Sequence, residues 1–338
     1  MTSLYHILSK YYTPKWKNFI FLLIFIIRKF YYKNITKISH DSLTFYQKTY
    51  IFIYVKKVEK YIGDYVRKML GGKLMGEVIV ITSGKGGVGK TTTTANLGSA
   101  LALAGKKVAL VDTDIGLRNL DVVMGLENRI VYDLVDVIEG KCKLRQALIK
   151  DKRFHELFLL PAAQTKDKTA INEEQMKDLT DKLKAEFDYI LIDCPAGIEQ
   201  GFKNAIAGAD RALVVSTAEI SSIRDADRII GLLEASEIKN PELIVNRLKP
   251  AMAKRGEMMD VDDIVDLLSI DLIGVVPDDE NIIIQTNKGE PVISNKRAPS
   301  GKAYIEISRR LLGENIEVTV PGKEKGLWAK IKRLFGRA

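Results

Sequence analysis

The segment that begins at Gly84 contains residues whose types and spacing suit the binding of phosphate. It reads GKGGVGKT, with a glycine on each side of a four-residue gap, followed by a lysine and a hydroxyl residue. Glycines allow successive backbone N–H groups to close around phosphate oxygens. We expect Lys90 to neutralise the β- and γ-phosphates and the Thr91 hydroxyl to ligate Mg²⁺. The predicted nucleotide-binding residues are Gly84, Lys85, Gly86, Gly87, Val88, Gly89, Lys90, Thr91 and Thr92.

The elements on either side of this loop would hold it in place. Glu77–Thr82 is an apolar run typical of a buried strand, and an Ala- and Leu-rich helix is predicted to run to about Ala104. Gly105 fits the C-terminal cap of that helix. A helix N-terminus directly after the loop adds positive potential where the phosphates would lie. This context favours a phosphate loop over an accidental glycine turn.

Two later strands are predicted to end in an acidic residue. Lys107–Asp112 is followed closely by Asp114, and Tyr189–Asp193 is a hydrophobic strand with a terminal carboxylate. The second is the Walker B pattern, in which the aspartate holds Mg²⁺ through water. Each aspartate alone could instead cap a helix. Because both accompany a phosphate loop, a role at the metal site is the favoured interpretation.

Strands and helices alternate along the rest of this region, and this alternation predicts the fold class. Further strands are expected at Leu157–Leu160, Arg211–Ser216, Glu242–Asn246 and Leu272–Val276, with helices that include Glu173–Glu186 and Ser222–Ala235. The pattern implies an α/β fold with a doubly wound, mostly parallel sheet and helices on both faces, as in P-loop NTPases. Ligands bind at the carboxyl ends of the strands in such sheets.

A second lysine at the start of the loop, Lys85, makes the motif more specific. KGGVGKT resembles the deviant Walker A motif of the family that contains MinD, ParA, ArsA and the nitrogenase iron protein. The resemblance implies that Lys85 reaches across a homodimer interface to the partner's ATP, so that two chains enclose two ATP molecules. It also implies a slow, Mg²⁺-dependent ATPase stimulated by a partner, with Lys85, Lys90 and Asp114 as its catalytic residues.

The same resemblance assigns further roles. Asp114 would orient the attacking water in switch I, and Asp112 would lie near the metal held by Thr91 and Asp193. The segment Pro195-Ala196-Gly197 resembles switch II, in which the N–H of Gly197 senses the γ-phosphate. Two strand ends resemble the family's adenine pocket, which would be formed by Asn246, Arg247, Pro277 and Asp278.

Within this family the chain is similar to the MinD branch from about Met75 to Ala338. The shared blocks include Asp114–Asp121 and Ser221–Arg228. The resemblance implies a membrane-associated ATPase that positions the division site, recruits a MinC-like inhibitor and is released by a MinE-like activator. It makes Asp225 and Asp227 candidate partner contacts, although a solvated helix face is an equal alternative.

The C-terminal residues 326–338 are predicted to form an amphipathic membrane-targeting helix after a linker at 314–325. At about 100° per residue, one face carries Leu327, Trp328, Ile331, Leu334 and Phe335, and the other carries Lys330, Lys332, Arg333 and Arg337. Such a helix suits an anionic bilayer. Two tails in one dimer would bind much more tightly than one, so ATP-driven dimerisation would become membrane attachment. Docking of the helix on its own protein is the alternative.

Residues 1–74 differ in composition from the ATPase domain expected at 75–313. They carry 14 Lys and Arg residues against three acidic residues in a chain of net charge +9, and they hold 10 of the 13 tyrosines. Their longest apolar run, Phe19–Ile27, is too short to span a bilayer as a helix. We consider an interfacial anchor, a disordered arm, or in-frame sequence upstream of a start at Met75, and we favour the third.

Charge and cysteine content weigh against the competing functions. A ParA-type partition ATPase would bind DNA through a basic dimer surface, but the region between the two basic ends is net acidic, so no specific nucleic acid is expected. Cys142 and Cys194 match neither a disulfide framework nor a cluster motif. A nucleotide-locked scaffold without turnover is disfavoured by Asp114 and Asp193. The expected location is peripheral, on the inner face of a bacterial cell membrane or of the plastid inner envelope.

Overall fold

The computed structural model describes residues 75–167 and 170–322. The chain divides into two units, Met1–Lys73 and Leu74–Ala338, and all described residues belong to the second. The expectations for residues 1–74 and for the helix at 326–338 therefore concern segments outside the described residues. None of the helices in the described part is both long enough and apolar enough to cross a membrane.

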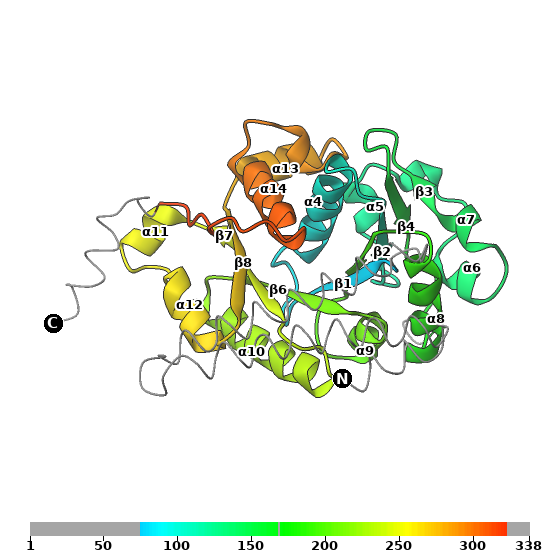
Figure 1. The fold of residues 1–338 in the computed structure, drawn as a ribbon, viewed down its shortest axis with the longest axis horizontal. Helices are drawn as coiled ribbons and strands as arrows, with labels where there is room; N and C mark the ends of the chain where they lie inside the picture. The colour runs from blue at the N-terminus through cyan, green and yellow to red at the C-terminus, as the bar shows by residue number, and fades with distance from the viewer. Residues whose placement is uncertain (1–74, 168–169, 323–338) are drawn as a thin grey trace, which may run out of the picture. The chain divides into compact units, whose positions relative to one another are not determined.

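The second unit is built on one sheet whose strands alternate with helices (Figure 1). The strands are β1 Glu77–Thr82, β2 Val108–Asp112, β3 Ile149–Lys150, β4 Leu157–Leu160, β5 Tyr189–Asp193, β6 Arg211–Thr217, β7 Glu242–Leu248 and β8 Asp271–Pro277. The longer helices are α4 Lys90–Leu103, α8 Glu173–Lys184, α10 Ile220–Ala235, α12 Val261–Leu268 and α14 Pro299–Leu311. The shorter ones are α5 Leu120–Val123, α6 Leu134–Ile138, α7 Leu144–Ala147, α9 Gln200–Ile206, α11 Pro250–Lys254 and α13 Glu280–Thr286, with 3₁₀ turns η1 Glu127–Arg129 and η3 Val292–Ser294.

The strand order within the described residues is β3-β4-β2-β5-β1-β6-β7-β8. All neighbours are parallel except β3 and β4, which are antiparallel. The central strand β1 is buried because its apolar residues face helices on both sides, as expected for a parallel strand. The predicted doubly wound, mostly parallel fold is confirmed.

Helices cover both faces of the sheet, and each face has its own core. Helices α4, α5 and α14 pack on one face, where Leu97, Leu110 and Tyr304 are fully buried. Helices α8, α9, α10 and α12 cover the other, where Leu183 and Ile229 are fully buried. The two layers fix the carboxyl edge of the sheet, where the predicted site residues lie.

Apart from shifts of one residue at strand ends, two details differ from the strands expected from the sequence. Strand β3 was not predicted, because two residues are too few to show a periodicity. Strand β7 does not end at Asn246-Arg247 but continues to Leu248 through a shift in its pairing with β8. At this irregularity Arg247 has a positive φ of 54°. A bulge of this kind re-aims neighbouring side chains without ending the strand.

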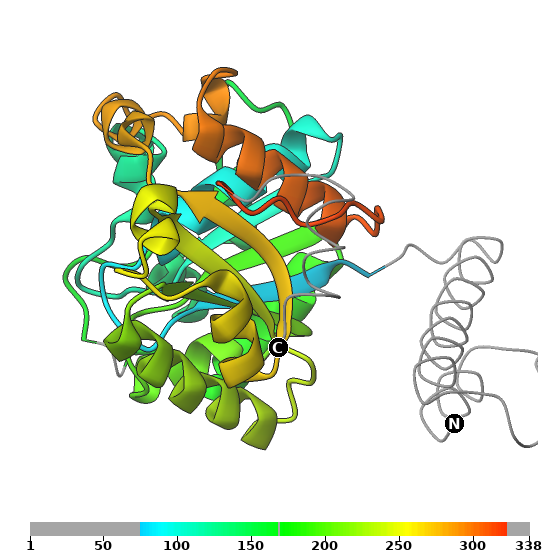
Figure 2. The same ribbon diagram turned by 90° about the vertical axis from the view of Figure 1, so that its left-hand side faces the viewer.

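The segment after α14, residues 314–322, lies along the protein as an extended strap. Arg310 donates to the carbonyl oxygens of Ile316 and Glu317, at 2.9 and 2.7 Å, and to that of Ile273 in β8, at 3.1 Å. Val318 and Val320 pack against the core on the α12 face. In Figure 2 the strap is drawn in red as it leaves α14 and crosses β8. Most of the predicted linker is thus held by the protein.

Candidate functional site

The segment Gly84–Thr91 forms the turn after β1 and the start of α4, at the carboxyl end of the central strand. Gly87 and Gly89 have φ values of +78° and +102°, which side chains disfavour. A Cβ on Gly84 would lie 2.3 Å from the carbonyl oxygen of Asp225, so this glycine permits the close approach of α10. Three of the predicted glycines, Gly84, Gly87 and Gly89, are therefore needed for the shape of the loop.

The two lysines of the loop point to different places. Lys90 is 8% exposed, and its Nζ donates to Ser83 Oγ at 3.0 Å, inside its own loop. Lys85 is exposed, and its Nζ lies 3.3 Å from Ser221 Oγ and 3.7 Å from Glu219 Oε2 at the start of α10. Lys90 thus lies where it can meet a phosphate of its own chain, while Lys85 is directed away from that place.

Two aspartates face each other beside the loop. Asp112 and Asp193 are partners in the register of β2 and β5, and both are buried, at 0% and 2% exposure. Thr94 Oγ1 donates to Asp193 Oδ1 at 3.3 Å. The Asp112 carboxylate accepts from the backbone N–H of Asp114 at 2.9 Å and of Leu120 at 3.2 Å. Asp112 thereby shapes the turn that carries Asp114, a contact that the sequence did not reveal.

Burial changes the proton affinity of this carboxylate pair. It raises the pKa of Asp112 to about 8, with a further rise from the charge of Asp193. It raises the pKa of Asp193 to about 6, where hydrogen bonds from Thr91 and Thr94 and the charge of Lys90 oppose it. Two adjacent buried carboxylates cannot both ionise cheaply unless a cation neutralises them. The donor set beside the phosphate loop therefore fits Mg²⁺ held jointly with a nucleotide.

No cluster of three or more His, Cys, Asp and Glu side chains suited to a metal occurs in the described ranges.

The predicted switch II segment lies directly after β5. Gly197 has a φ of +93°, and Ala196 comes within contact distance of a Cβ placed on Gly86 of the phosphate loop. The structure thus brings this segment next to the loop, as the proposed γ-phosphate sensing requires.

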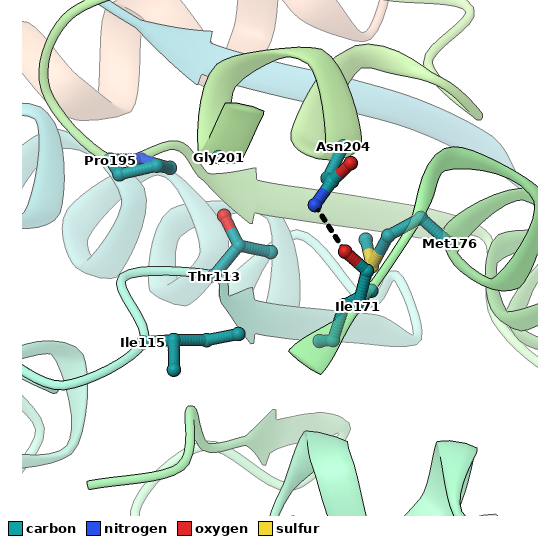
Figure 3. A pocket seen from close by; sticks show the side chains of 7 residues that line it. All are labelled: Thr113, Ile115, Ile171, Met176, Pro195, Gly201 and Asn204. Carbon is teal, nitrogen blue, oxygen red and sulfur yellow. Dashed lines mark hydrogen bonds between the residues drawn. The ribbon is translucent and has the colours of Figure 1, made fainter. Parts of the chain in front are cut away.

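A small pocket adjoins both switch segments (Figure 3). Its lining residues are Thr113, Ile115, Ile171, Met176, Pro195, Gly201 and Asn204. Its polar side chains have partners, because Asn204 Nδ2 donates to the Ile171 carbonyl at 2.6 Å and Thr113 Oγ1 to the Asp193 carbonyl at 2.7 Å. The pocket contains none of the predicted phosphate or metal residues, so it is not the nucleotide site.

The two segments predicted to form the adenine pocket lie side by side at the ends of β7 and β8. Asp278 N–H donates to the Leu248 carbonyl at 2.9 Å. Asn246 is buried, and its Nδ2 donates to the Val88 carbonyl of the phosphate loop at 2.7 Å. Its Oδ1 has no hydrogen-bond partner among the residues that the structure describes. Asn246 therefore braces the loop, a role that the sequence did not reveal, and still offers one acceptor. Arg247 is exposed beside it.

The remaining predicted residues lie on α4 and α10. Thr92 is half-buried at the start of α4, and its carbonyl accepts from Asn96 Nδ2 at 2.8 Å. On α10, Asp227 is exposed and Asp225 is half-buried against Gly84. The exposure of Asp227 suits a solvated face and a partner contact equally, whereas Asp225 also has a packing role next to the loop.

Known proteins with this arrangement decide the family. A model of the CobQ/CobB/MinD/ParA nucleotide binding domain matches residues 79–292. The septum site-determining protein MinD of Bacillus subtilis is 63% identical over 265 residues, which cover 78% of this chain and 99% of that protein. The chain belongs to the MinD family. It is a P-loop ATPase of septum site determination, and the family expected from Lys85 and the shared blocks is confirmed.

Solved structures of MinD-family proteins agree. The MinD chain in the MinC:MinD cell division protein complex from Aquifex aeolicus is 52% identical, with a TM-score of 0.68, and covers 72% of this chain and 99% of that chain. The septum site-determining protein MinD complexed with Mg-ADP from Pyrococcus horikoshii is 29% identical, with a TM-score of 0.65, and covers 72% and 100%. The expected septum-site function is thus supported over the partition alternative.

Proposed function

We propose that this MinD-family ATPase forms an ATP-dependent homodimer in which Lys85 acts on the partner's nucleotide. The proposal rests on the different directions in which the side chains of Lys85 and Lys90 point. Lys90 remains within its own loop, whereas Lys85 is 45% exposed and held by Glu219 and Ser221 at the protein surface. A surface pair of this kind is weak, so Lys85 can exchange it for a phosphate of another chain. A cation supplied in this way would stabilise the charge that develops in phosphoryl transfer.

The proposed nucleotide site uses the loop, α4 and the two aspartates. Backbone N–H groups of Gly84–Gly89 and the Lys90 ammonium would bind the phosphates, with Thr91, Asp193 and Asp112 at Mg²⁺. The Mg-ADP complex of the Pyrococcus horikoshii relative supports this ligand. Bound Mg²⁺ would neutralise phosphate charge. Asp114 would orient the attacking water, and Gly197 would respond to the γ-phosphate.

Adenine would lie between the ends of β7 and β8, beside Asn246, Arg247, Pro277 and Asp278. The buried Oδ1 of Asn246 supports this placement, because an acceptor without a partner suits an exocyclic amine.

The partners follow from relatives and from α10. The Aquifex aeolicus complex of MinC with MinD supports a MinC-like inhibitor as a partner of this chain. Asp225 and Asp227 are the candidate contacts, and a MinE-like activator would stimulate hydrolysis. The tail at 326–338 would attach the dimer to an anionic membrane. The strap, residues 314–322, is held against the ATPase domain, so the predicted tail follows a segment that is already fixed.

Mixing two inactive variants tests the transfer of Lys85 between chains. Lys85→Ala and Asp114→Ala should each fail to hydrolyse ATP when alone. In a mixed dimer, the Lys85→Ala chain keeps its own Asp114 and receives Lys85 from its partner. An equal mixture should therefore regain about a quarter of the wild-type rate, because about half of the dimers are mixed and one of their two sites works. If the mixture stays inactive while mixed dimers are present, Lys85 acts within its own chain.

A vesicle test addresses the tail. The full chain should pellet with anionic vesicles in Mg²⁺–ATP and much less in Mg²⁺–ADP, and a variant ending at Gly322 should not pellet in either. Pelleting that ignores the nucleotide would contradict the proposed coupling of dimerisation to membrane attachment.

A further inference from the structure

The turn between β2 and α5, residues 113–120, carries Asp114 and is held at several points. The carboxylate of Asp112 binds the backbone N–H groups of Asp114 and Leu120, near the two ends of the turn. In the middle, Gly116 N–H donates to the Ala163 carbonyl at 2.9 Å. Arg118 N–H donates to the Asp114 carbonyl at 3.0 Å. The position of Asp114 therefore depends on this turn being closed.

Arg118 closes the turn in an unusual way. Its φ is +42°, a value in the left-handed region that a residue with a long side chain rarely adopts. Its Nε lies 2.9 Å from Asp121 Oδ2, and the Asp121 side chain is completely buried. Burial raises the pKa of Asp121, and the charge of Arg118 opposes this rise. Each charge is thus costly without the other, and together they hold Arg118 in a strained backbone conformation.

Arg118 therefore connects the buried Asp121 carboxylate, through its side chain, to the backbone of Asp114, through its own N–H. Its Nε lies at ion-pair distance from a buried carboxylate, although the geometry gives no hydrogen bond between them, and its backbone N–H donates to the Asp114 carbonyl. Removal of one partner of a buried ion pair is costly, because it leaves the other charge uncompensated. Strained non-glycine residues concentrate at functional sites, where the surroundings impose the strain.

We propose that Arg118 and Asp121 are positioning residues for ATP hydrolysis. Their buried ion pair sets the backbone of the turn so that Asp114 is presented correctly at the end of β2. The inference rests on the proposed role of Asp114. It assigns to the pair no contact with the nucleotide, so loss of the pair should slow turnover without weakening ATP binding.

The test compares three variants of the full chain in ATPase assays, with KM and kcat measured separately. The double variant Arg118→Gln/Asp121→Asn removes both charges and avoids a lone buried charge. Its kcat should fall by about 30-fold or more, since small misplacements of a reacting group cost up to about a hundredfold. Its KM for ATP should stay within about threefold of the wild type. Arg118→Lys, which keeps the charge, should regain at least part of the lost kcat.

Asp114→Ala separates this inference from the proposed function. If Asp114→Ala hydrolyses ATP normally, the role of Asp114 itself is refuted. If Asp114→Ala is inactive but the double variant keeps kcat within about threefold of the wild type, only the positioning role is refuted. An equal loss in kcat and in ATP binding, or a loss that Arg118→Lys does not reduce, would also overturn it.

Discussion

The carboxylate pair Asp112 and Asp193 leads to a prediction about protons. Burial and mutual repulsion raise the pKa of Asp112 to about 8 and that of Asp193 to about 6. A carboxyl group whose pKa lies above the ambient pH keeps its proton. Mg²⁺ next to the pair favours the ionised forms and must displace that proton. Binding of Mg²⁺–ADP should therefore release protons and should be favoured by rising pH until the pair is ionised.

The pKa values set the size of this effect. At pH 7 the pair holds about one proton, because one of its two pKa values lies above this pH and the other lies below it. At pH 9 about a tenth of a proton remains on the pair. Proton release that arises from the pair should therefore fall from about one per site at pH 7 to about a tenth at pH 9.

Titration calorimetry in buffers of different ionisation enthalpy measures this release directly. The slope of the observed enthalpy against the buffer enthalpy gives the number of protons. Asp112→Asn should lower the slope at pH 7 by about 0.9 relative to the wild type, because the nucleotide's own protons cancel in the comparison. Asp260→Asn, which retains the capping of α12, should leave it unchanged. Equal slopes for the wild type and Asp112→Asn would refute the reasoning.

Two further predictions concern packing. Gly84→Ala places a Cβ 2.3 Å from the Asp225 carbonyl oxygen, so the loop must shift and nucleotide affinity should fall at least about tenfold in a binding titration. Gly231→Ala on α10 meets no atom within 4 Å and should preserve affinity, and equal affinities for the two variants would contradict this explanation. Arg310→Ala leaves three carbonyls without their donor and should lower the free energy of unfolding by about 2–4 kcal/mol in urea. Arg309→Ala breaks only an exposed pair with Glu314 and should shift the midpoint little, so a similar loss in both variants would refute the strap's role.

The sequence was informative where one signal decides the local structure. Apolar runs that end in an aspartate located β2 and β5 to within one residue, because a buried parallel strand needs a continuous apolar segment. The glycine spacing of the phosphate loop likewise corresponds to positive φ values at Gly87 and Gly89. Both signals are local, so they can be interpreted without knowledge of the tertiary structure.

Other features of the site depend on contacts between distant residues. The bond from Asn246 to Val88 joins residues 158 positions apart, and no pattern near either residue indicates it. Arg118 and Asp121 are three residues apart, and this spacing alone is compatible with a buried pair and with two side chains that face solvent. The sequence does not show which of the two applies, because burial depends on distant parts of the chain. The strap had a signal that was overlooked, because Ile316, Val318 and Val320 alternate with polar residues at the period of an extended segment.

The strap also affects how a shortened chain would behave. Among the described residues strand β8 ends the sheet, and an open strand edge is a template for pairing with another molecule. Arg310 donates to one carbonyl of that strand, and Val318 and Val320 pack against the core on the α12 face. A protein that ends at Gly313 would lose the contacts of the strap. The edge of β8 would then be more open to pairing with a strand of another molecule. Oligomers of this shortened chain would form by edge-to-edge aggregation, independent of ATP, and would be easy to mistake for a nucleotide-driven dimer.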